Sequence, residues 1–214
     1  QVTGQVLEVM THCPAETLIT DVGSTKASIV AGVEAAVLCA RAAGQTLRGR
    51  FIGSHPMAGS EKKGVGHASA DLFVQRAVIV TPGPTTLPRD VKTIERFWKS
   101  LGGRVTRQPP DVHDAAVAAI SHLPHLLASA LAAVSPKEHL PLVAGGWRDT
   151  TRVAGGDAEL WRQILLDNRQ ELLKSLAHFS DMLEQFRTAL EQGDSPALSR
   201  LLELGKKIRD AVGN

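Results

Sequence analysis

The sequence contains a histidine in a position that suits acid–base chemistry. His55 follows the apolar segment Phe51–Gly53, which we expect to form a short buried strand. A side chain just past the end of a strand is held by a rigid scaffold and can still face a cleft. Because a neutral imidazole accepts a proton near pH 7, His55 is a candidate catalytic group. The alternative interpretation is a surface loop whose histidine has no chemical role.

A polar turn earlier in the chain is a second candidate. Gly23–Lys26 follows the β-rich run Thr17–Val22 and opens a helix of small residues that we expect to reach about Ala43. In α/β sheets, ligands bind at turns of this kind, beyond the carboxyl ends of parallel strands. The hydroxyl of Ser24 can cap the helix or contact a ligand, and capping is the more frequent role for such a serine.

Cationic side chains occur together in a glycine-rich segment, residues 143–156. Arg148 and Arg152 lie near backbone amides that glycines leave accessible, an arrangement that suits a carboxylate or a phosphate. The alternative is a solvated turn closed by an ion pair between Asp149 and Arg152.

Two histidines flank a proline in a segment that otherwise has a helical pattern. Pro124 removes a backbone donor, so we expect a kink near His122 and His125. Such histidines most often bond to carbonyl groups that a kink frees. A metal site is the second possibility, but His113 and Asp114 lie too many turns away to converge easily, so we predict no metal.

The composition argues against several classes of partner. The chain has 214 residues, 43% hydrophobic and 21% charged, and a net charge of +2, so we predict no nucleic-acid partner. No apolar run approaches ~20 residues and no signal-peptide pattern occurs, so we also predict no membrane association. Cys13 and Cys39 are far apart in sequence, which favours reduced thiols and a cytoplasmic location.

The order of the elements predicts the fold class. Strand and helix patterns alternate through residues 1–108, and only helical patterns follow in 109–214. We therefore expect α/β followed by all-α: the C-terminal part of a Rossmann-type parallel sheet domain, then a helical domain. The nearest match to G-x-G-x-x-G is Gly64–Ser69, which lacks the third glycine, so we expect a fragment without the phosphate-binding front of the sheet.

The helical part carries a heptad pattern. Apolar residues recur at alternating spacings of four and three, at Leu172, Leu176, Phe179, Leu183, Phe186 and Leu190. This spacing predicts a helix that packs along another helix, in the same chain or in a partner. We therefore expect a homodimer that forms through the C-terminal helices.

Five segments together resemble the prephenate/arogenate dehydrogenases of tyrosine biosynthesis. They occur in that family's order and span essentially the whole chain: Asp21–Lys26, Gly53–Lys62, His113-Asp114, Ser121–His125 and Gly146–Arg152. The resemblance implies a Rossmann domain followed by a helical dimerisation domain, with the active site in the cleft between them. It also implies NAD(P)-dependent oxidative decarboxylation of a small-molecule substrate, prephenate or arogenate, to 4-hydroxyphenylpyruvate or tyrosine.

The resemblance also implies roles for individual residues. His55 matches the catalytic histidine that accepts the hydrogen bond of the ring hydroxyl, and Ser24 matches a serine that supports it near the nicotinamide. Arg152 matches the arginine that binds the ring carboxylate. The other implied substrate contacts are His125, Ser60, Glu61, Arg148 and Gly146, and Asp21 joins Ser24 as an implied contact of NAD or NADP. Glu61 is expected to pair with Arg152 in the empty pocket. Arg148 is expected to reach the site as a second cation, and the other subunit is one possible source of it.

Two alternatives come from other classes of protein. The first is a non-catalytic dimerisation or regulatory module, which the missing glycine motif favours. The second is a metal-dependent hydrolase built on His113, Asp114, His122 and His125.

Overall fold

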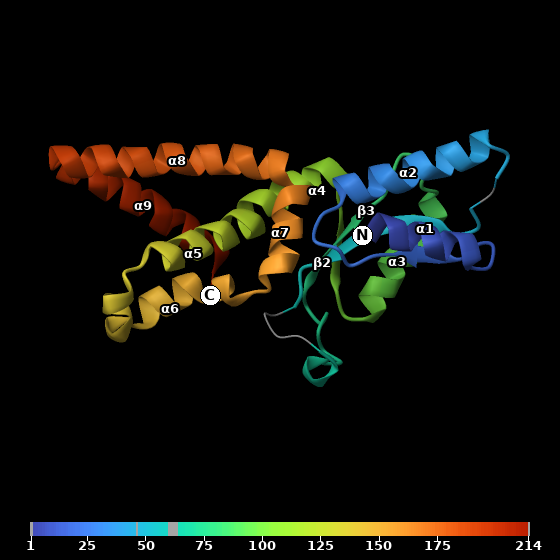
Figure 1. The fold of residues 1–214 in the computed structure, drawn as a ribbon, viewed down its shortest axis with the longest axis horizontal. Helices are drawn as coiled ribbons and strands as arrows, with labels where there is room; N and C mark the ends of the chain where they lie inside the picture. The colour runs from blue at the N-terminus through green and yellow to red at the C-terminus, as the bar shows by residue number, and fades with distance from the viewer. Residues whose placement is uncertain (1, 46, 60–63, 214) are drawn as a thin grey trace. The chain divides into compact units, whose positions relative to one another are not determined.

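The computed structural model describes residues 2–45, 47–59 and 64–213, which form two compact units divided between Leu172 and Leu173 (Figure 1). The α/β part comprises α1 (Val2–His12), β1 (Leu18–Thr20), α2 (Ala27–Ala42), β2 (Arg50–Pro56), the 3-10 helix η1 (Val65–His67), β3 (Ala77–Thr81), α3 (Pro88–Ser100) and β4 (Arg104–Arg107). Helices follow: α4 (Pro110–Val117), the π turn η2 (Ala118–His122), α5 (Leu123–Val134), the 3-10 helix η3 (Lys137–Leu142), α6 (Gly145–Thr151), the 3-10 helix η4 (Arg152–Gly155), α7 (Ala158–Asp167), α8 (Arg169–Gln192) and α9 (Ser195–Val212). The predicted order of classes, α/β and then all-α, is confirmed.

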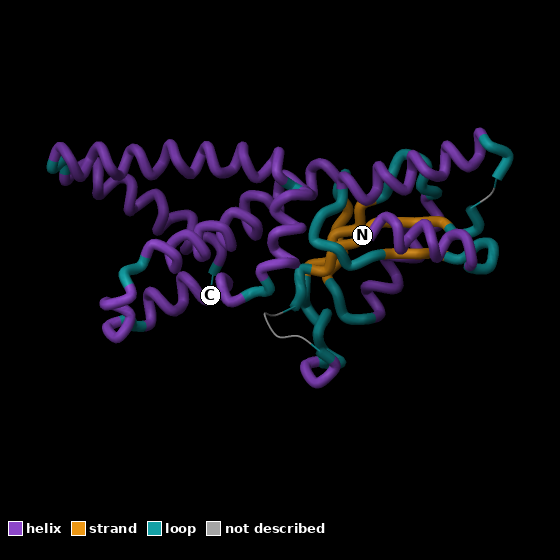
Figure 2. The backbone as a smooth tube through the Cα atoms, viewed as in Figure 1, coloured by secondary structure: helices purple, strands orange, loops and turns teal. Residues whose placement is uncertain are grey.

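The strands form one sheet in the order β1-β2-β3-β4 (Figure 2). β1 runs parallel to β2 and β3 runs parallel to β4, but β2 and β3 are antiparallel. The prediction of an all-parallel sheet is therefore wrong at this pair. Parallel neighbours need a crossover of a dozen or more residues, usually a helix, and α2 and α3 supply the two crossovers. Within the described residues between β2 and β3, the only helix is the single turn η1, and β3 returns antiparallel.

Helices cover both faces of the sheet. Ile52, Val78, Val80 and Trp98 belong to a buried cluster between the sheet and α3. On the other face, α1 and α2 bury a second cluster, against which Phe51 of β2 packs. Neighbouring residues on a strand point to opposite faces, so Phe51 and Ile52 pack into the clusters on opposite faces of the sheet. Each fully buried side chain of this size contributes ~1.5–3 kcal/mol. The two layers hold β2 rigidly, and β2 carries His55.

The helix that follows the sheet has a widened turn. α4, η2 and α5 are continuous from Pro110 to Val134, with a π turn at Ala118–His122 where the amide of Leu123 bonds to the carbonyl of Ala118. The predicted interruption near Pro124 is therefore a widened turn, because proline lacks an amide hydrogen and its ring crowds the carbonyl four residues back.

The same helix has the length and hydropathy of a membrane span, by composition alone. Core helices of water-soluble proteins pass this test too, and this one contacts α2 and β3 and carries His113 and Asp114 inside the fold. The absence of a membrane partner remains a prediction.

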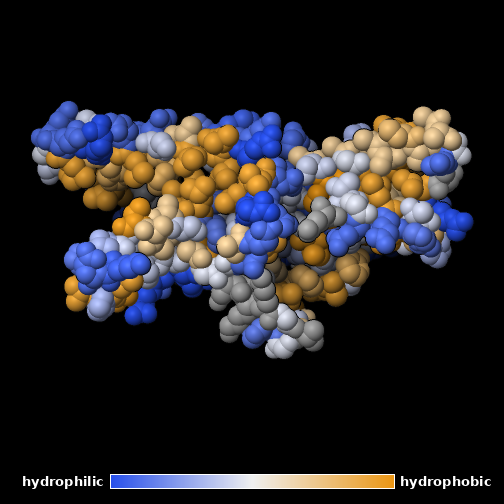
Figure 3. Space-filling model, in the orientation of Figure 1, coloured by the Kyte–Doolittle hydropathy of each residue, from blue (hydrophilic) through white to orange (hydrophobic). Residues whose placement is uncertain are grey.

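The second unit contains the rest of α8 and all of α9. Gly193 joins the two helices with φ +62°, and the side chain of Asp194 caps α9 by accepting from the amide of Ala197. Many of the large apolar residues of this unit are exposed, and Figure 3 shows hydrophobic side chains gathered along α8. They include Leu173, Leu183, Leu190, Leu202, Ile208 and Val212. An apolar surface of this kind suits a protein–protein contact.

Candidate functional site

His55 lies inside β2, one residue before its end. The sequence placed the end of the strand at Gly53, but Gly53–Pro56 continue the ladder with β3, and His55 pairs with Ile79. The expectation of a loop histidine is therefore wrong. His55 is only 9% exposed, so the sheet fixes its backbone and its ring lies in the interior.

A chain of hydrogen bonds determines which nitrogen of His55 is protonated. His113 Nδ1 lies 2.7 Å from Asp114 Oδ1, and His113 Nε2 lies 2.8 Å from His55 Nδ1. An ionised carboxylate can only accept, so His113 donates from Nδ1, and in its neutral form it accepts at Nε2. His55 then donates from Nδ1. Its Nε2 keeps a lone pair, which is what an acceptor for a substrate hydroxyl requires.

Asp114 is ionised although it is buried. Burial by itself raises the pKa of this carboxyl, but the hydrogen bonds from His113, Ala27 and Lys26 together lower the pKa below its ordinary value. The two oxygens accept from the backbone amides of Lys26 at 2.8 Å and of Ala27 at 2.9 Å. These amides begin α2, so Asp114 caps that helix from 88 positions along the chain.

This cap corrects the role expected of Ser24. α2 begins at Ala27, three residues after Ser24, and no described side chain at its own N-cap position bonds to its amides. Ser24 is half-buried and lines a cavity of about 790 Å³ between its own loop and α7. Asp167 of α7, which lines the same cavity, accepts from the hydroxyls of Thr25 and Ser28. Ser24 therefore remains available as a ligand contact.

Asp21 holds the same loop against β2. Its Oδ1 accepts from the amide of Ser54 at 3.1 Å, its Oδ2 accepts from the amide of Gly23 at 2.9 Å, and it forms an ion pair with Lys26. Lys26 is fully buried, and this burial lowers the pKa of its ammonium against the opposing effect of Asp21. Asp21 is thus engaged by protein groups, and its contact with a cofactor remains a prediction.

A second group of side chains comes from the widened helix and from α7. Trp161 stacks on His125 with ring centroids 3.6 Å apart and planes 11° apart. Asn168 donates from Nδ2 to the carbonyl of Asp114 at 2.8 Å and contacts His122 Nδ1 at 3.1 Å. The sequence suggested bonds to carbonyls that a kink frees, but among the described residues His122 bonds instead to the side chain of Asn168.

His55, His122 and His125 are neutral at pH 7. Burial, followed by the nearby His113 and Lys26, lowers the pKa of His55 to about 3. Burial lowers the pKa of His122 to about 4 and also lowers that of His125. The two groups of side chains are connected through Asp114, whose carboxylate bonds to His113 and whose carbonyl accepts from Asn168. Among the residues that the structure describes, no three His, Cys, Asp or Glu side chains are arranged to hold a metal ion.

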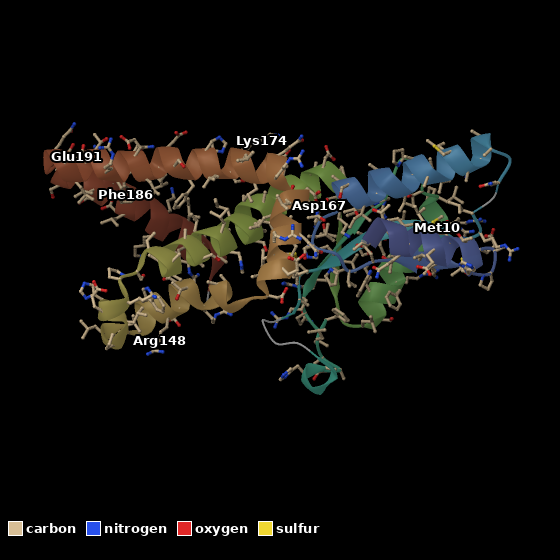
Figure 4. All side chains as sticks on the ribbon, in the orientation of Figure 1. Met10, Arg148, Asp167, Lys174, Phe186 and Glu191 are labelled. Atoms are coloured by element: carbon tan, nitrogen blue, oxygen red, sulfur yellow. The ribbon has the colours of Figure 1, made fainter. Side chains whose placement is uncertain are left out.

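The remaining predicted residues are exposed or lie outside the described residues. Arg152 is exposed at the start of η4, which packs against the helix that carries His125. Arg148 is also exposed, and Figure 4 shows it on the side of α6 that is remote from Asp167. A Cβ added at Gly146 would meet no atom within 4 Å. Ser60 and Glu61 lie outside the described residues.

Sequence reasoning missed two members of the site. Lys26 was part of a recognised motif but received no role, and Asn168 looked like an ordinary break between two helices. A lysine five residues after an aspartate, at the end of a buried strand, is a usable signal for a buried ion pair. No local pattern connects Asn168 with Asp114, because the two are 54 residues apart.

Comparison with known proteins agrees with this arrangement. Residues 1–107 match the family model for the nucleotide-binding domain of prephenate dehydrogenase, and residues 109–204 match the model for its dimerization domain. The prephenate dehydrogenase of Bacillus subtilis (strain 168) is 35% identical, over 97% of this chain and 56% of that protein. The chain thus spans little more than half the length of this curated relative.

Two solved structures are also similar. The arogenate dehydrogenase of Synechocystis matches with a TM-score of 0.81 and 31% identity, over 98% of this chain and 74% of that one. The prephenate dehydrogenase of Aquifex aeolicus, in complex with hydroxyphenyl propionate and NAD+, matches with a TM-score of 0.83 and 29% identity, over 98% and 72%.

The fold and the site define a class of protein in which a nucleotide-binding α/β domain precedes a helical dimerisation domain. Within that class, the matches over both parts place the chain in the prephenate dehydrogenase family.

The buried histidines predict how stability depends on pH. Their folded pKa values, about 3 for His55 and about 4 for His122, lie below the ~6.5 of an unfolded histidine. The unfolded state therefore binds more protons, and the free energy of unfolding falls as the pH drops below ~6.5. Each histidine should account for a loss of about 2 kcal/mol by pH 5.

Urea unfolding at pH 7.5 and at pH 5, followed by the fluorescence of buried Trp98, measures this loss. His55→Asn should reduce the difference between the two pH values, and exposed His12→Asn should leave it unchanged. Equal stability of the wild-type chain at both pH values would contradict the assignment of neutral buried histidines.

Proposed function

We propose that this chain takes part in the NAD(P)-dependent oxidative decarboxylation of prephenate or arogenate to 4-hydroxyphenylpyruvate or tyrosine. One observation carries the proposal: ionised Asp114 acts through His113 so that His55 presents an unprotonated Nε2. The names of the similar proteins support it, since they include both prephenate and arogenate dehydrogenases. A non-catalytic module has no need of a buried imidazole held in one tautomer.

In the proposed reaction, His55 Nε2 accepts the hydrogen bond of the ring hydroxyl and takes its proton as the carbinol carbon loses hydride. NAD or NADP, when bound, accepts that hydride. Loss of the ring carboxylate as carbon dioxide then gives the aromatic ring, which makes the overall step favourable. The Nδ1 hydrogen bond to His113 stabilises the imidazolium, because positive charge on His55 is drawn towards ionised Asp114.

The residues of this chain fit the nicotinamide end of such a cofactor. The loop at the carboxyl end of β1 opens onto the cavity of about 790 Å³, with the half-buried Ser24 in its wall. The carboxyl end of a strand is where doubly wound sheets place their ligands. We assign Ser24 to contact the nicotinamide and Asp21 to hold the loop in shape. The sequence contains no G-x-G-x-x-G motif, so the pyrophosphate contacts are not assigned to these 214 residues.

We assign the anionic end of the substrate to Arg152, because a guanidinium binds a carboxylate through two parallel hydrogen bonds. His125, stacked on Trp161, would form a flat wall of the same pocket. Ser60, Glu61 and Gly146 remain proposed contacts. Because Arg148 is exposed and lies on the side of α6 that is remote from Asp167, we propose that it serves the site of the other subunit.

The proposed working unit is a homodimer in the cytoplasm. The match to a dimerization domain and the exposed apolar surface of the second unit support this assembly. We take residues 1–108 as the cofactor part and residues 109–214 as the helical part. The separate Cys13 and Cys39 are both free thiols, which suits a reducing compartment.

His55→Asn tests the catalytic assignment in the natural full-length protein. Asparagine keeps a polar side chain but cannot take up the proton, so kcat should fall by about 10²- to 10⁴-fold. Binding of hydroxyphenyl propionate should change little, and His12→Asn serves as the matched control. Near-normal turnover of both prephenate and arogenate would remove His55 from the mechanism.

Arg152→Gln tests the carboxylate contact. A lost charge-assisted hydrogen bond is worth ~1.5–3 kcal/mol, so KM for prephenate should rise by about 10- to 100-fold. KM for NAD should stay close to its wild-type value, and the exposed Arg96→Gln should affect neither constant. An equal loss for substrate and cofactor would show that Arg152 acts on the fold instead.

The double substitution Leu183→Glu and Leu190→Glu tests the dimer. Light scattering of the wild-type chain should give twice 22.8 kDa, and the variant should give 22.8 kDa, because buried unpaired carboxylates oppose association. Leu38→Glu, at an exposed position of α2, should remain dimeric. A wild-type monomer would rule out this interface.

A further inference from the structure

The amide of Asn168 has a fixed orientation. Its Nδ2 lies 2.8 Å from the carbonyl oxygen of Asp114, which can only accept a hydrogen bond. The nitrogen of the side chain must therefore face Asp114, and the same nitrogen lies 3.1 Å from His122 Nδ1. Asn168 is buried, so no water competes for these positions.

This orientation determines the tautomer of His122. Because Asn168 donates to His122 Nδ1, that nitrogen carries the lone pair. His122 is neutral at pH 7, since burial lowers its pKa to about 4, and its proton is therefore on Nε2. His122 and His55 thus present their Nε2 atoms in opposite states, one as a donor and the other as an acceptor.

The donor of His122 has no partner in the part of the chain that the structure describes. His122 is 1% exposed, and its Nε2 makes no hydrogen bond there. A buried donor without a partner is unfavourable, and native structures rarely leave one unsatisfied. The ring of His122 lies 6.2 Å from that of Trp161 in a T-shaped arrangement, and Trp161 also stacks on His125, so the three rings form one aromatic group.

We infer that His122 is a further substrate-binding residue, which donates from Nε2 to an oxygen of the substrate, and that Asn168 is the residue that positions it. The acceptor is a carboxylate oxygen on the end of the substrate that is remote from the ring hydroxyl. This role rests on the proposed function, because His55 is taken to hold the hydroxyl. Asp114 then determines the tautomers of both histidines. Its carboxylate acts on His55 through His113. Its carbonyl acts on His122 through Asn168.

The tautomers can be measured without any assay of activity. Nitrogen-15 NMR of the histidine-labelled chain at pH 7 distinguishes protonated from unprotonated ring nitrogens. We expect a proton on Nε2 of His122 and on Nδ1 of His55. Asn168→Asp offers His122 a carboxylate, so the proton of His122 should move to Nδ1 and that of His55 should stay. A proton on Nδ1 of wild-type His122 would overturn the inference.

Binding of hydroxyphenyl propionate to the full-length protein with NAD+ tests the contact itself. His122→Phe removes the donor and should raise Kd by about tenfold or more. His122→Gln can place an amide donor near the position of Nε2 and should restore most of the affinity. A Kd for His122→Phe equal to that of the wild type would overturn the proposed contact, and if this variant does not fold, the wild-type NMR result decides.

A second probe, 4-propylphenol, identifies the acceptor. It lacks the carboxylate, so its affinity should not depend on His122 if the donor binds a carboxylate oxygen. An equal loss for both probes would show that His122 acts on the pocket in general, which contradicts the assignment. Protein with the expected tautomers and probe affinities but no turnover of prephenate or arogenate would refute the proposed function and leave the donor role of His122 in place.

Discussion

The structure of the site depends on one buried carboxylate. Asp114 accepts from His113 and from the amides of Lys26 and Ala27 at the start of α2, and its carbonyl accepts from Asn168. An isolated buried carboxylate would lose its hydration and become protonated, and only these donors keep it ionised. The same contacts fix α4 against the start of α2. The carboxylate of Asp114 therefore connects the α/β part to the helices that follow. It also determines the protonation pattern of the histidines near it.

This arrangement explains how a weakly basic histidine can serve as a base. A pKa of about 3 means that His55 stays unprotonated in the empty site over the physiological range. A proton that arrives at Nε2 is stabilised when His55 donates through His113 towards Asp114, much as the aspartate of a serine protease triad stabilises an imidazolium without taking its proton. The surroundings therefore disfavour a positive charge on His55 before the reaction, but they stabilise the charge that develops on it during the proposed reaction. Selective stabilisation of a transition state requires this difference.

The sequence predicted local features well and long-range ones poorly. The alternation of strands and helices followed from periodicities that short segments of the sequence contain. The motifs identified the family, and the role of His55 stays a prediction. The antiparallel pairing of β2 with β3 was missed, because the direction of β3 depends on the path of the connection between the two strands and not on the residues of the strands. Ser24 looked like a cap because the true cap, Asp114, lies 88 residues beyond Lys26, whose amide it accepts from. Asn168 was missed for the same reason, because its partners Asp114 and His122 are distant in sequence and are brought to it by tertiary packing.

The widened turn explains how one helix brings its polar residues together. In a regular helix each residue turns about 100°, so His122 would lie about 80° from Asp114, and His125 about 120° from His113. A π turn takes up roughly one extra residue, which subtracts about 100° from every position beyond it. His122 then falls within about 20° of Asp114, and His125 within about 20° of His113, in agreement with their burial and with the Asn168 bridge. Pro124, which forces the wider turn, therefore determines which polar residues of this helix share one face.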